Sequence, residues 1–537
     1  MLVTLSMKEI GTLTSMALAT KQLQATVLDE IGIFGLDTQT HPTALDPNWF
    51  TKADNIVYTE GGRVTFRKGV KQLTLGTGNP IGSIVEHKLT NKVFASTNGS
   101  LSEVNLADKD NAFINTFATG ASDSDWQFIE YDDEIYCFQE GADPVEYDAG
   151  TWALLKNTTG YGAPTGVTTF DPRCGLGNFG RMWAGGISED KNTLFYSQLE
   201  APHKWATGDA GYIDLKYVWG GDEIVNISSY AGKLVIFGRQ NIAIYNDPWD
   251  VAAMSLDEVI KGVGCVSRDS VRAIGNDLFF VSDTGVRSLQ RTAEFDKLPL
   301  KDISLTIKDE MIANISNSRN IKSVFVFNEG LYIVSFVDLN VTYVFDITSM
   351  TPKGTPRVTK WHFEGGRNPV SMAYSETYGL LFGQEGGHVC SYEGHYDIDY
   401  IGSNVYKYYS YTGGFSTVWI DLGQGFMSSI LKRMLIVISG GQGTDAGLRL
   451  YKDFELTASS SATFKLNPSV SGTSFTWGAA SSLFGAAKYA PIYGLKEVGL
   501  PLAGDAKYIR FEMDAVTKGY KASLQSITLL YKQGKVY

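Results

Sequence analysis

Cysteine and histidine are scarce in this chain. Its 537 residues include six scattered histidines and four cysteines, Cys137, Cys174, Cys265 and Cys390. The cysteines lie far apart and mostly within predicted strands, which indicates free buried thiols in a protein made in a reducing cytoplasm rather than a disulfide framework. With so few histidines and no G-x-S-x-G motif, the sequence gives no indication of a hydrolase triad.

Long apolar runs and basic stretches are also missing. No segment approaches the roughly eighteen apolar residues of a membrane helix, and Lys8 and Glu9 interrupt the opening segment where a signal peptide needs its apolar centre. The net charge is −12 with a pI near 5.1, and no Lys/Arg-rich stripe offsets it, so sequence-specific DNA binding is not expected. An acidic wall would instead let a polyanion slide past without sticking.

The chain has the composition of a folded protein, and it contains a repeat. Hydrophobic residues make up 43% and charged residues 19%, and 57 glycines suit many tight turns, which is typical of a folded protein. One phrase of three short apolar runs separated by polar turns recurs about seven times. The copies begin at Ser83, Gln127, Gly175, Asn226, Arg272, Ser323 and Ser371.

The repeat predicts a β-propeller. Its period suits one four-stranded blade, and its runs are short and rich in aromatic and β-branched residues, as buried middle strands are. We expect six to eight blades, with seven the best estimate; a hairpin between Asn55 and Leu73 could complete the first or last blade or add one. The alternative fold is a large β-sandwich, which rarely repeats one pattern so evenly.

Three regions follow from this pattern. Residues 1–54 are predicted as an N-terminal arm and strap, 55–396 as the propeller, and 397–537 as a C-terminal antiparallel β-sandwich used in assembly, because longer strands with period-two alternation replace the repeat there. Met7 or Met16 could equally be the true start. The Ser- and Ala-rich stretch from Thr457 to Ala490 is predicted as a long mobile loop.

Glycine-rich motifs favour turns over phosphate binding. Gly175 to Gly180 matches G-x-G-x-x-G, but a strand and not a helix follows, so a blade turn is the better interpretation. Gly441 to Gly447 is predicted as a hairpin loop.

Metal-like groupings are weak. His388, Cys390 and His395 could share one strand face but have no fourth zinc ligand. Asp123-Ser124-Asp125 and Asp397-Ile398-Asp399 lack the glycine and distal glutamate of an EF-hand loop, so we interpret both as solvated turns.

Carboxylates and hydroxyls give no catalytic pattern either. Asp132, Asp133 and Glu134 cluster in a turn expected to face solvent. Ser282-Asp283-Thr284-Gly285 resembles the start of a sialidase Asp-box, yet lacks its spacing and tryptophan. We therefore expect no catalytic residues, no cofactor-binding residues and no metal ligands, and we expect that the protein is not an enzyme.

Several short segments occur in an order found in one known family. They are Gly35-Leu36-Asp37 on to Leu45 and Asn55, Glu60-Gly61-Gly62-Arg63, Arg67-Lys68-Gly69, Arg181-Met182-Trp183, Leu194-Phe195-Tyr196-Ser197, Pro202, Trp205, Leu234-Val235-Ile236-Phe237, Ile242, Tyr245, Gly264 to Ser267, Asp277 to Val281 and Gly285-Val286. In these segments the chain resembles the tail nozzle family of short-tailed bacteriophages (podoviruses), also called tail tubular protein B or tail hub.

The resemblance implies a structural virion protein. A member of this family would form a hexameric ring at the distal tail, retain DNA and then let double-stranded DNA pass non-specifically, and contact a portal-adaptor ring and tail fibres or tailspikes. Its place would be the virion tail, assembled in the host cytoplasm without membrane insertion. The alternative is a propeller glycosidase or a carbohydrate-binding adhesion module that acts on host surface polysaccharide.

Overall fold

The structure is a computed structural model of the 537-residue chain. It describes residues 23–28, 30–59, 62–121, 123–290, 302–422, 427–441, 443–466, 495–502 and 504–536. Residues 1–22 of the predicted N-terminal arm and strap (1–54) lie outside the described residues. In the described part of the chain, no helix is both long and apolar enough to cross a membrane.

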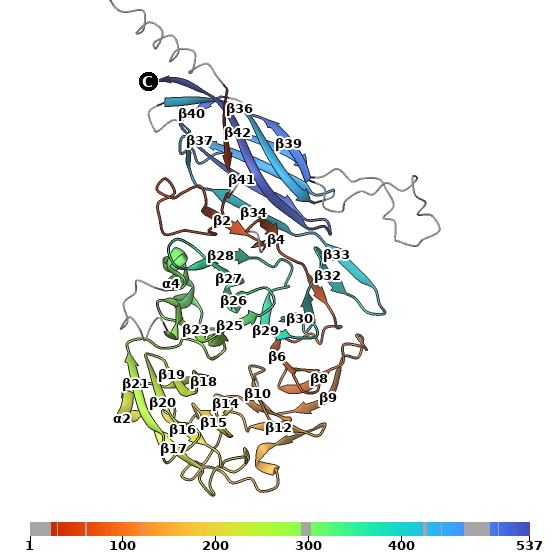
Figure 1. The fold of residues 1–537 in the computed structure, drawn as a ribbon. Coiled ribbons are helices and arrows are strands. Elements are labelled where there is room, and N and C mark those ends of the chain that lie inside the picture. Colours follow the sequence, from red (N-terminus) through yellow and green to blue (C-terminus); the bar gives the residue numbers. More distant parts are fainter. Residues whose placement is uncertain are drawn as a thin grey trace, which may run out of the picture.

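Small antiparallel sheets surround a common axis in the lower part of Figure 1. Four four-stranded blades come first: β6 (Ile81–His87), β7 (Lys92–Thr97), β8 (Ser100–Val104) and β9 (Phe113–Ala118); β10 (Gln127–Tyr131), β11 (Glu134–Phe138), β12 (Val145–Asp148) and β13 (Thr151–Leu154); β14 (Cys174–Asn178), β15 (Arg181–Gly185), β16 (Thr193–Tyr196) and β17 (Gly211–Asp214); β18 (Ile224–Tyr230), β19 (Lys233–Gly238), β20 (Asn241–Asn246) and β21 (Ser255–Lys261).

A three-stranded sheet and two further four-stranded blades complete the circle. They are β22 (Arg272–Ile274), β23 (Asp277–Ser282) and β24 (Gly285–Ser288); β25 (Ile321–Val326), β26 (Leu331–Phe336), β27 (Val341–Met350) and β28 (Pro356–Trp361); β29 (Pro369–Ser375), β30 (Gly379–Gln384), β31 (Val389–Tyr392) and β5 (Val70–Gln72). The described residues thus form six four-stranded blades, with the three-stranded sheet at a seventh position.

Contacts between the innermost strands close the ring. β6 neighbours β10 on one side and β29 on the other, β14 lies between β10 and β18, and the short helix η2 (Arg268–Ser270) and β22 fill the space between β18 and β25. The predicted repeats begin within β6, β10, β14, β18, β22, β25 and β29. The prediction of an all-β propeller with six to eight blades is confirmed.

Packing between blades explains the apolar runs of the repeat. Middle strands such as β19 and β26 are buried along almost their whole length, because each blade covers the faces of its neighbours. All four cysteines are free and buried in this packing, as the sequence predicts. The hairpin β14–β15 confirms the blade-turn interpretation of Gly175 to Gly180, and a Cβ on Gly175 would come within 2.5 Å of the Phe138 ring of the preceding blade.

The C-terminal part is a β-sandwich, at the top of Figure 1. One sheet has the order β3 (Ile56–Tyr58), β4 (Val64–Phe66), β42 (Ala522–Val536), β36 (Met427–Gly440) and β39 (Leu495–Pro501), with β1 (Gln24–Leu28) on β42 and β40 (Asp505–Ala506) on β36. The other contains β2 (Phe50–Asp54), β34 (Thr412–Thr417), β41 (Tyr508–Val516), β37 (Asp445–Lys452) and β38 (Ser460–Lys465), with β35 (Ile420–Asp421) on β41. The predicted sandwich is confirmed.

Strand β2 joins the two parts of the molecule. It pairs with β28 of a blade on one side and with β34 of the sandwich on the other, so one ten-stranded sheet runs from propeller to sandwich. The hydrophobic core is continuous there too, because one cluster contains Phe345 and Val358 of the blade together with Phe415 and Ile436 of the sandwich.

The segment from Asn55 to Leu73 divides between the two parts. The prediction that its hairpin belongs to a blade is wrong for β3–β4, which pairs with β42 of the sandwich, whereas β5 adds the outer strand of the last blade. Strands β32 (Asp397–Tyr400) and β33 (Tyr406–Tyr409) extend that same blade sheet beyond β5. Pairings between distant segments are not encoded in local periodicity, which explains the error.

The predicted loop after Thr457 also contains a strand. β38 pairs with β37 in full register, so the loop prediction is wrong for these six residues, whereas residues 467–494 lie outside the described residues. The hairpin prediction for Gly441 to Gly447 is wrong, because β36 and β37 belong to different sheets; this segment connects the two sheets of the sandwich, and its last three residues belong to β37. The remaining elements are η1 (Leu155–Asn157), α2 (Lys216–Trp219), η4 (Leu305–Ile307), α4 (Lys308–Asn317) and η5 (Val337–Leu339).

Candidate functional site: the axial cavity of the propeller

A cavity of about 890 Å³ lies where the innermost strands meet. Residues of β6, β10, β25 and β29 form its walls, and η2 and β22 contribute from a fifth direction. The wall contains both polar and apolar groups, with Phe128, Phe325 and Tyr374 among the aromatic residues. A concave site with a few converging polar groups is the usual form of a binding site.

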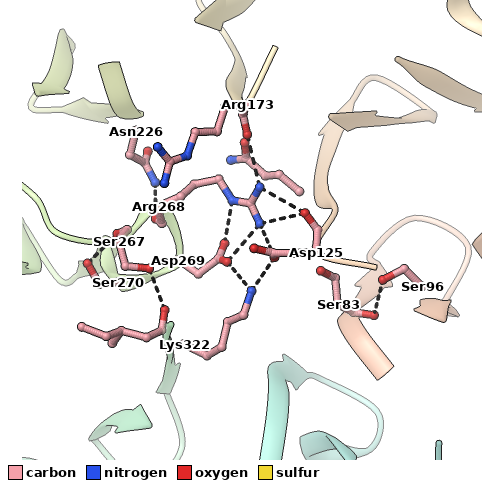
Figure 2. Close-up of polar contacts among 12 residues, drawn as sticks. Ser83, Ser96, Asp125, Arg173, Asn226, Ser267, Arg268, Asp269, Ser270 and Lys322 are labelled. Atoms are coloured by element: carbon pink, nitrogen blue, oxygen red, sulfur yellow. Dashed lines mark hydrogen bonds and ion pairs between the residues drawn. The ribbon is translucent and has the colours of Figure 1, made fainter. Parts of the chain in front are cut away.

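One end of the cavity is closed by Arg268, Asp269 and Lys322, and Asp125 pairs with two of them; we call these four charged residues the axial ion cluster. Asp125 precedes β10, Arg268 and Asp269 lie on η2, and Lys322 lies in β25. Figure 2 shows the four side chains converging. Nη2 of Arg268 lies 2.6 Å from Oδ1 of Asp125 and 3.0 Å from Oδ2 of Asp269, and Nζ of Lys322 lies 2.5 Å and 2.6 Å from the same two oxygens.

Backbone groups tie further blades into the cluster. Arg268 donates through Nη1 to the carbonyl oxygen of Arg173, just before β14, at 3.2 Å, and Asn226 of β18 donates to the carbonyl oxygen of Arg268. Ser323 of β25 donates to the carbonyl oxygen of Asp269 at 2.7 Å. The cluster thus connects successive blades across the axis.

Burial and mutual attraction set the charge states. Burial alone would raise the pKa of Asp269, but the charges of Arg268 and Lys322 hold it well below its ordinary value. Burial would lower the pKa of Lys322, and Asp269 and Asp125 raise it instead. Arg268 and Lys322 have only 6% and 9% of their side chains exposed, so their attraction to Asp269 is weakly screened, whereas Asp125, with 45% of its side chain exposed, interacts partly through solvent.

Arg272 supplies a further cation at this end. Its Nε and Nη2 donate to the carbonyl oxygen of Ser323 at 3.0 Å and 2.9 Å, and Nη1 donates to that of Val271 at 3.1 Å. Among the described residues no carboxylate forms an ion pair with it. Desolvation therefore lowers the pKa of this guanidinium, although Asp269 acts in the opposite direction.

The opposite end of the cavity is acidic. Here the inner strands end, and Glu86, Lys88, Glu130 and Glu376 line the wall. Glu86 is only 6% exposed; its carboxylate accepts hydrogen bonds from Ser375 Oγ at 2.7 Å and from the Glu376 backbone N–H at 2.8 Å. Glu130 accepts a hydrogen bond from the Lys88 backbone N–H at 3.0 Å.

An exposed aromatic side chain stands at this mouth. Phe327 lines the cavity, has 75% of its surface exposed, and meets the ring of Phe325 edge-on at 6.3 Å. Together with the carboxylates it gives this end the character of a cation-binding surface.

Of the aspartates predicted as solvated turns, Asp123 is exposed and accepts from the Ser124 and Asp125 backbone N–H groups, as predicted, but the other three have cationic partners. Asp125 belongs to the axial ion cluster, and Asp397 is 2% exposed, accepts from the Val70 N–H at 3.0 Å and lies 3.5 Å from Arg67. Asp399 forms a two-pronged pair with Arg367 at 2.9 Å and 2.8 Å. The turn prediction is wrong for these residues because their cationic partners come from distant parts of the sequence.

The other candidate residues do not converge on the cavity. His388 is bonded through Nδ1 to the Thr74 carbonyl oxygen at 2.9 Å, His395 faces the Arg67 carbonyl oxygen at 3.3 Å, and Cys390 is buried. Among the described residues, no three His, Cys, Asp or Glu side chains form a possible metal site. Asp132 and Glu134 lie at the β10–β11 turn, as predicted.

The hydroxyl motif closes a turn of its own sheet. The Ser282 hydroxyl donates to the Gly285 carbonyl oxygen at 2.9 Å, and Asp283 pairs with Arg239 of the neighbouring blade at 2.9 Å.

Sequence reasoning missed the axial ion cluster. Asp125 and Lys322 lie 197 positions apart, and the pairing of Arg268 with Asp125 spans 143. The one local signal was Lys322 itself, a cation within an apolar inner strand whose neighbours Ile321 and Ser323 are fully buried.

Comparison with known proteins does not show a family for this chain. No protein-family model matches the sequence, and no curated protein matches it. Among solved structures the chain is similar to the WD40 domain of Pan2 from Neurospora crassa, with 10% identity and a TM-score of 0.35, covering 61% of this chain and 96% of that one. The strand pairing and inner-strand contacts described above define this molecule as a β-propeller fused to a β-sandwich.

Proposed function

We propose that this protein is a structural subunit of the tail nozzle of a short-tailed bacteriophage. Six copies would form a ring at the distal end of the tail, below a portal-adaptor ring and beside tail fibres or tailspikes. The ring would retain DNA before infection and pass double-stranded DNA non-specifically afterwards. In this role the chain acts as a wall and not as an enzyme, and it works in the virion tail after assembly in the host cytoplasm.

The observation that carries the proposal is where the resembling segments lie. Asn55, from the first of these segments, lies at the junction of the propeller and the sandwich. Its side chain donates to the Thr412 carbonyl oxygen of the sandwich at 2.7 Å and accepts from the His362 backbone N–H beside a blade at 2.8 Å and from Arg67 Nε at 3.0 Å. Its φ of 53° is a conformation that asparagine tolerates better than most residues.

Arg67 and Gly69, from the same group, complete this junction. The Arg67 side chain is fully buried; it pairs with Asp397 and lies 4.1 Å from the centre of the Tyr411 ring. Gly69 has no room for a side chain, because a Cβ would come within 1.8 Å of the Tyr396 carbonyl oxygen. These residues have an architectural role: they fix the sandwich against the propeller.

The shared sheet supports a mechanical function. Because β2 pairs with both a blade and the sandwich, the two parts cannot rotate against each other without breaking backbone hydrogen bonds. A ring that resists the pressure of packaged DNA needs such rigid subunits. The charge of −12 per subunit suits a conduit that should not bind phosphates.

Immunogold electron microscopy of phage particles tests the location. Particles made from the genome that encodes this chain are labelled with gold-coupled antibodies raised against the purified protein. Gold at the tail tip agrees with the proposal, and gold on the capsid or on free fibres contradicts it. Reading frames next to this gene that encode a portal or adaptor protein would also support the proposal, and they can be found without the microscopy experiment.

A carbohydrate-binding adhesion module or propeller glycosidase is the second candidate. The axial cavity favours it, because it combines aromatic rings such as Phe128 and Tyr374 with carboxylates such as Glu130 and Glu376, as sugar-binding sites do. Incubation of the protein with host surface polysaccharide, followed by size analysis of the sugar, tests this. Cleavage or retention by a monomer would favour this candidate over the nozzle.

A further inference from the structure

The axial cavity has opposite charges at its two ends. At the end closed by the axial ion cluster, the residues that line it are three cations, Arg268, Arg272 and Lys322, and one carboxylate, Asp269. Asp125, which balances the cluster, does not line the cavity. At the open mouth the balance is reversed, with the carboxylates of Glu86, Glu130 and Glu376 and the ammonium of Lys88.

Two of these charged groups form no ion pair with the described residues, although Asp269 acts on Arg272 at longer range. In the described part of the chain, neither Arg272 nor Glu86 takes part in an ion pair, although each is hydrogen-bonded to neutral groups. An occupant that brings a carboxylate to Arg272 and a cation to the mouth would gain two charge-assisted interactions in a partly desolvated site.

The length of the cavity sets the size of such an occupant. Lys322 lines the closed end and Phe327 the mouth, five residues apart along β25 and its end. At about 3.3 Å per residue this is a span of about 16 Å, which an extended peptide of about five residues would cover. A free amino acid is too short to reach both ends.

The wall between the charged ends suits a peptide. The half-buried rings of Phe325 and Phe128 offer apolar contact to side chains. In the described part of the chain, the inner edges of β6, β10, β25 and β29 pair with no further strand, and an extended chain can bond to such an edge.

We propose that the axial cavity binds the carboxyl-terminal end of a peptide chain, with the terminal carboxylate at Arg272 and a basic side chain at the mouth between Glu130 and Glu376. The terminal carboxylate enters first, and the basic side chain lies about four residues upstream, against the carboxylates and the ring of Phe327. This site is independent of the nozzle proposal, because a monomer contains all of it.

Fluorescence anisotropy with synthetic peptides tests this binding. The probe is fluorescein-labelled Gly-Lys-Ala-Ala-Ala-Phe with a free carboxylate, titrated with the full-length protein. We expect saturable binding with a Kd below about 1 mM, weakened about tenfold when the C-terminus is amidated and again when lysine is replaced by glutamate. Absence of binding to the free-carboxylate probe, or equal binding of the amidated peptide, overturns the proposal.

Variants locate the site. The double variant Glu130→Gln with Glu376→Gln should bind the lysine peptide about tenfold more weakly than the unsubstituted chain does. It should bind the peptide with glutamate in place of lysine at least as tightly as the unsubstituted chain does. Asp257→Asn, on the outer strand β21 and away from the cavity, is the matched control and should bind as the unsubstituted chain does. If the double variant and the control bound the lysine peptide equally well, the proposal would be overturned. It would also be overturned if a neutral polysaccharide displaced the peptide and the affinity did not depend on the charge of the peptide.

Discussion

Lys322 shows most clearly what single residues contribute to this molecule. Its ammonium lies within 2.6 Å of both Asp125 and Asp269, and only 9% of its side chain is exposed. A buried ion pair adds little net stability compared with an apolar replacement of both partners, but removal of one partner leaves an uncompensated charge. The cluster therefore stabilises the packing of the blades only while all four of its members are present.

Replacement of Lys322 by methionine should destabilise the propeller by about 3 kcal/mol. The physical reason is that Asp269 and Asp125 lose one of the two cations that balance them. Urea unfolding followed by tryptophan fluorescence measures the effect as a lower midpoint. Lys233→Met, which removes an exposed pair with Asp257, is the matched control and should leave the midpoint unchanged. Equal midpoints for both variants would show that the cluster does not hold the blades.

The pH dependence of Asp269 follows from the direction of its pKa shift. Its folded pKa lies below the ordinary value of 3.8, so its contribution is present above that value and is lost as the pH falls towards the folded pKa. The pKa of Lys322 is raised above 10.5, so its contribution is complete below that value and is lost only as the pH rises through the folded pKa.

The stability difference between the unsubstituted chain and Asp269→Asn should therefore be constant from about pH 5 to about pH 9 and shrink below about pH 4. Urea midpoints measured at a series of pH values check this. A difference that grew on acidification would mean that Asp269 is not held as a charged group in the folded state.

At the scale of elements, strand β5 closes the ring and Gly69 makes this possible. The residues of β5 pair antiparallel with β31, which places a segment from before the first blade in the last one. The backbone at Gly69 lies very close to the backbone at Gly394 and Tyr396. The Gly69 N–H donates to the Gly394 carbonyl oxygen at 3.0 Å, and the Gly69 Cα faces the Tyr396 backbone.

Gly69→Ala should displace β5 and open the propeller, at a cost of about 3 kcal/mol. Limited proteolysis would then cut near residues 70–72, and the thermal midpoint would fall. Gly221→Ala is the control, since a Cβ there meets nothing within 4 Å and its φ is not in the left-handed region. Its midpoint should stay within about 1 kcal/mol of the unsubstituted chain. If both variants resisted protease equally, β5 would not be the closing strand.

The elements also show what the sequence could predict. Apolar runs such as Leu234–Phe237 are local, repeat evenly and must be buried on both faces, so the blades and the sandwich were predictable. The placement of β2, of β3–β4 and of β5 depends on pairings between distant segments, which leave no periodic trace. The axial cavity was unpredictable for the same reason, because Asp125 and Lys322 meet only after the ring has closed.

At the scale of the whole molecule, one continuous core unites propeller and sandwich. The cluster that contains Phe50, Phe415 and Val358 extends across both, and the rings of Phe50 and Phe415 stack at 4.6 Å. Motion of the two parts against each other would disrupt this shared core, and a repeated wall element would need that resistance. Its two parts also offer different surfaces to neighbours, as a closed ring of head-to-tail contacts requires.

The central claim is that copies of this chain assemble into a ring, and electron microscopy of the purified protein tests it most directly. Class averages at rising protein concentration, with the mass of the particles measured on the same sample, give both shape and copy number. The account predicts hollow six-fold rings with an open centre. Monomers that remain single at every concentration, particularly if they cleave host polysaccharide, would contradict it.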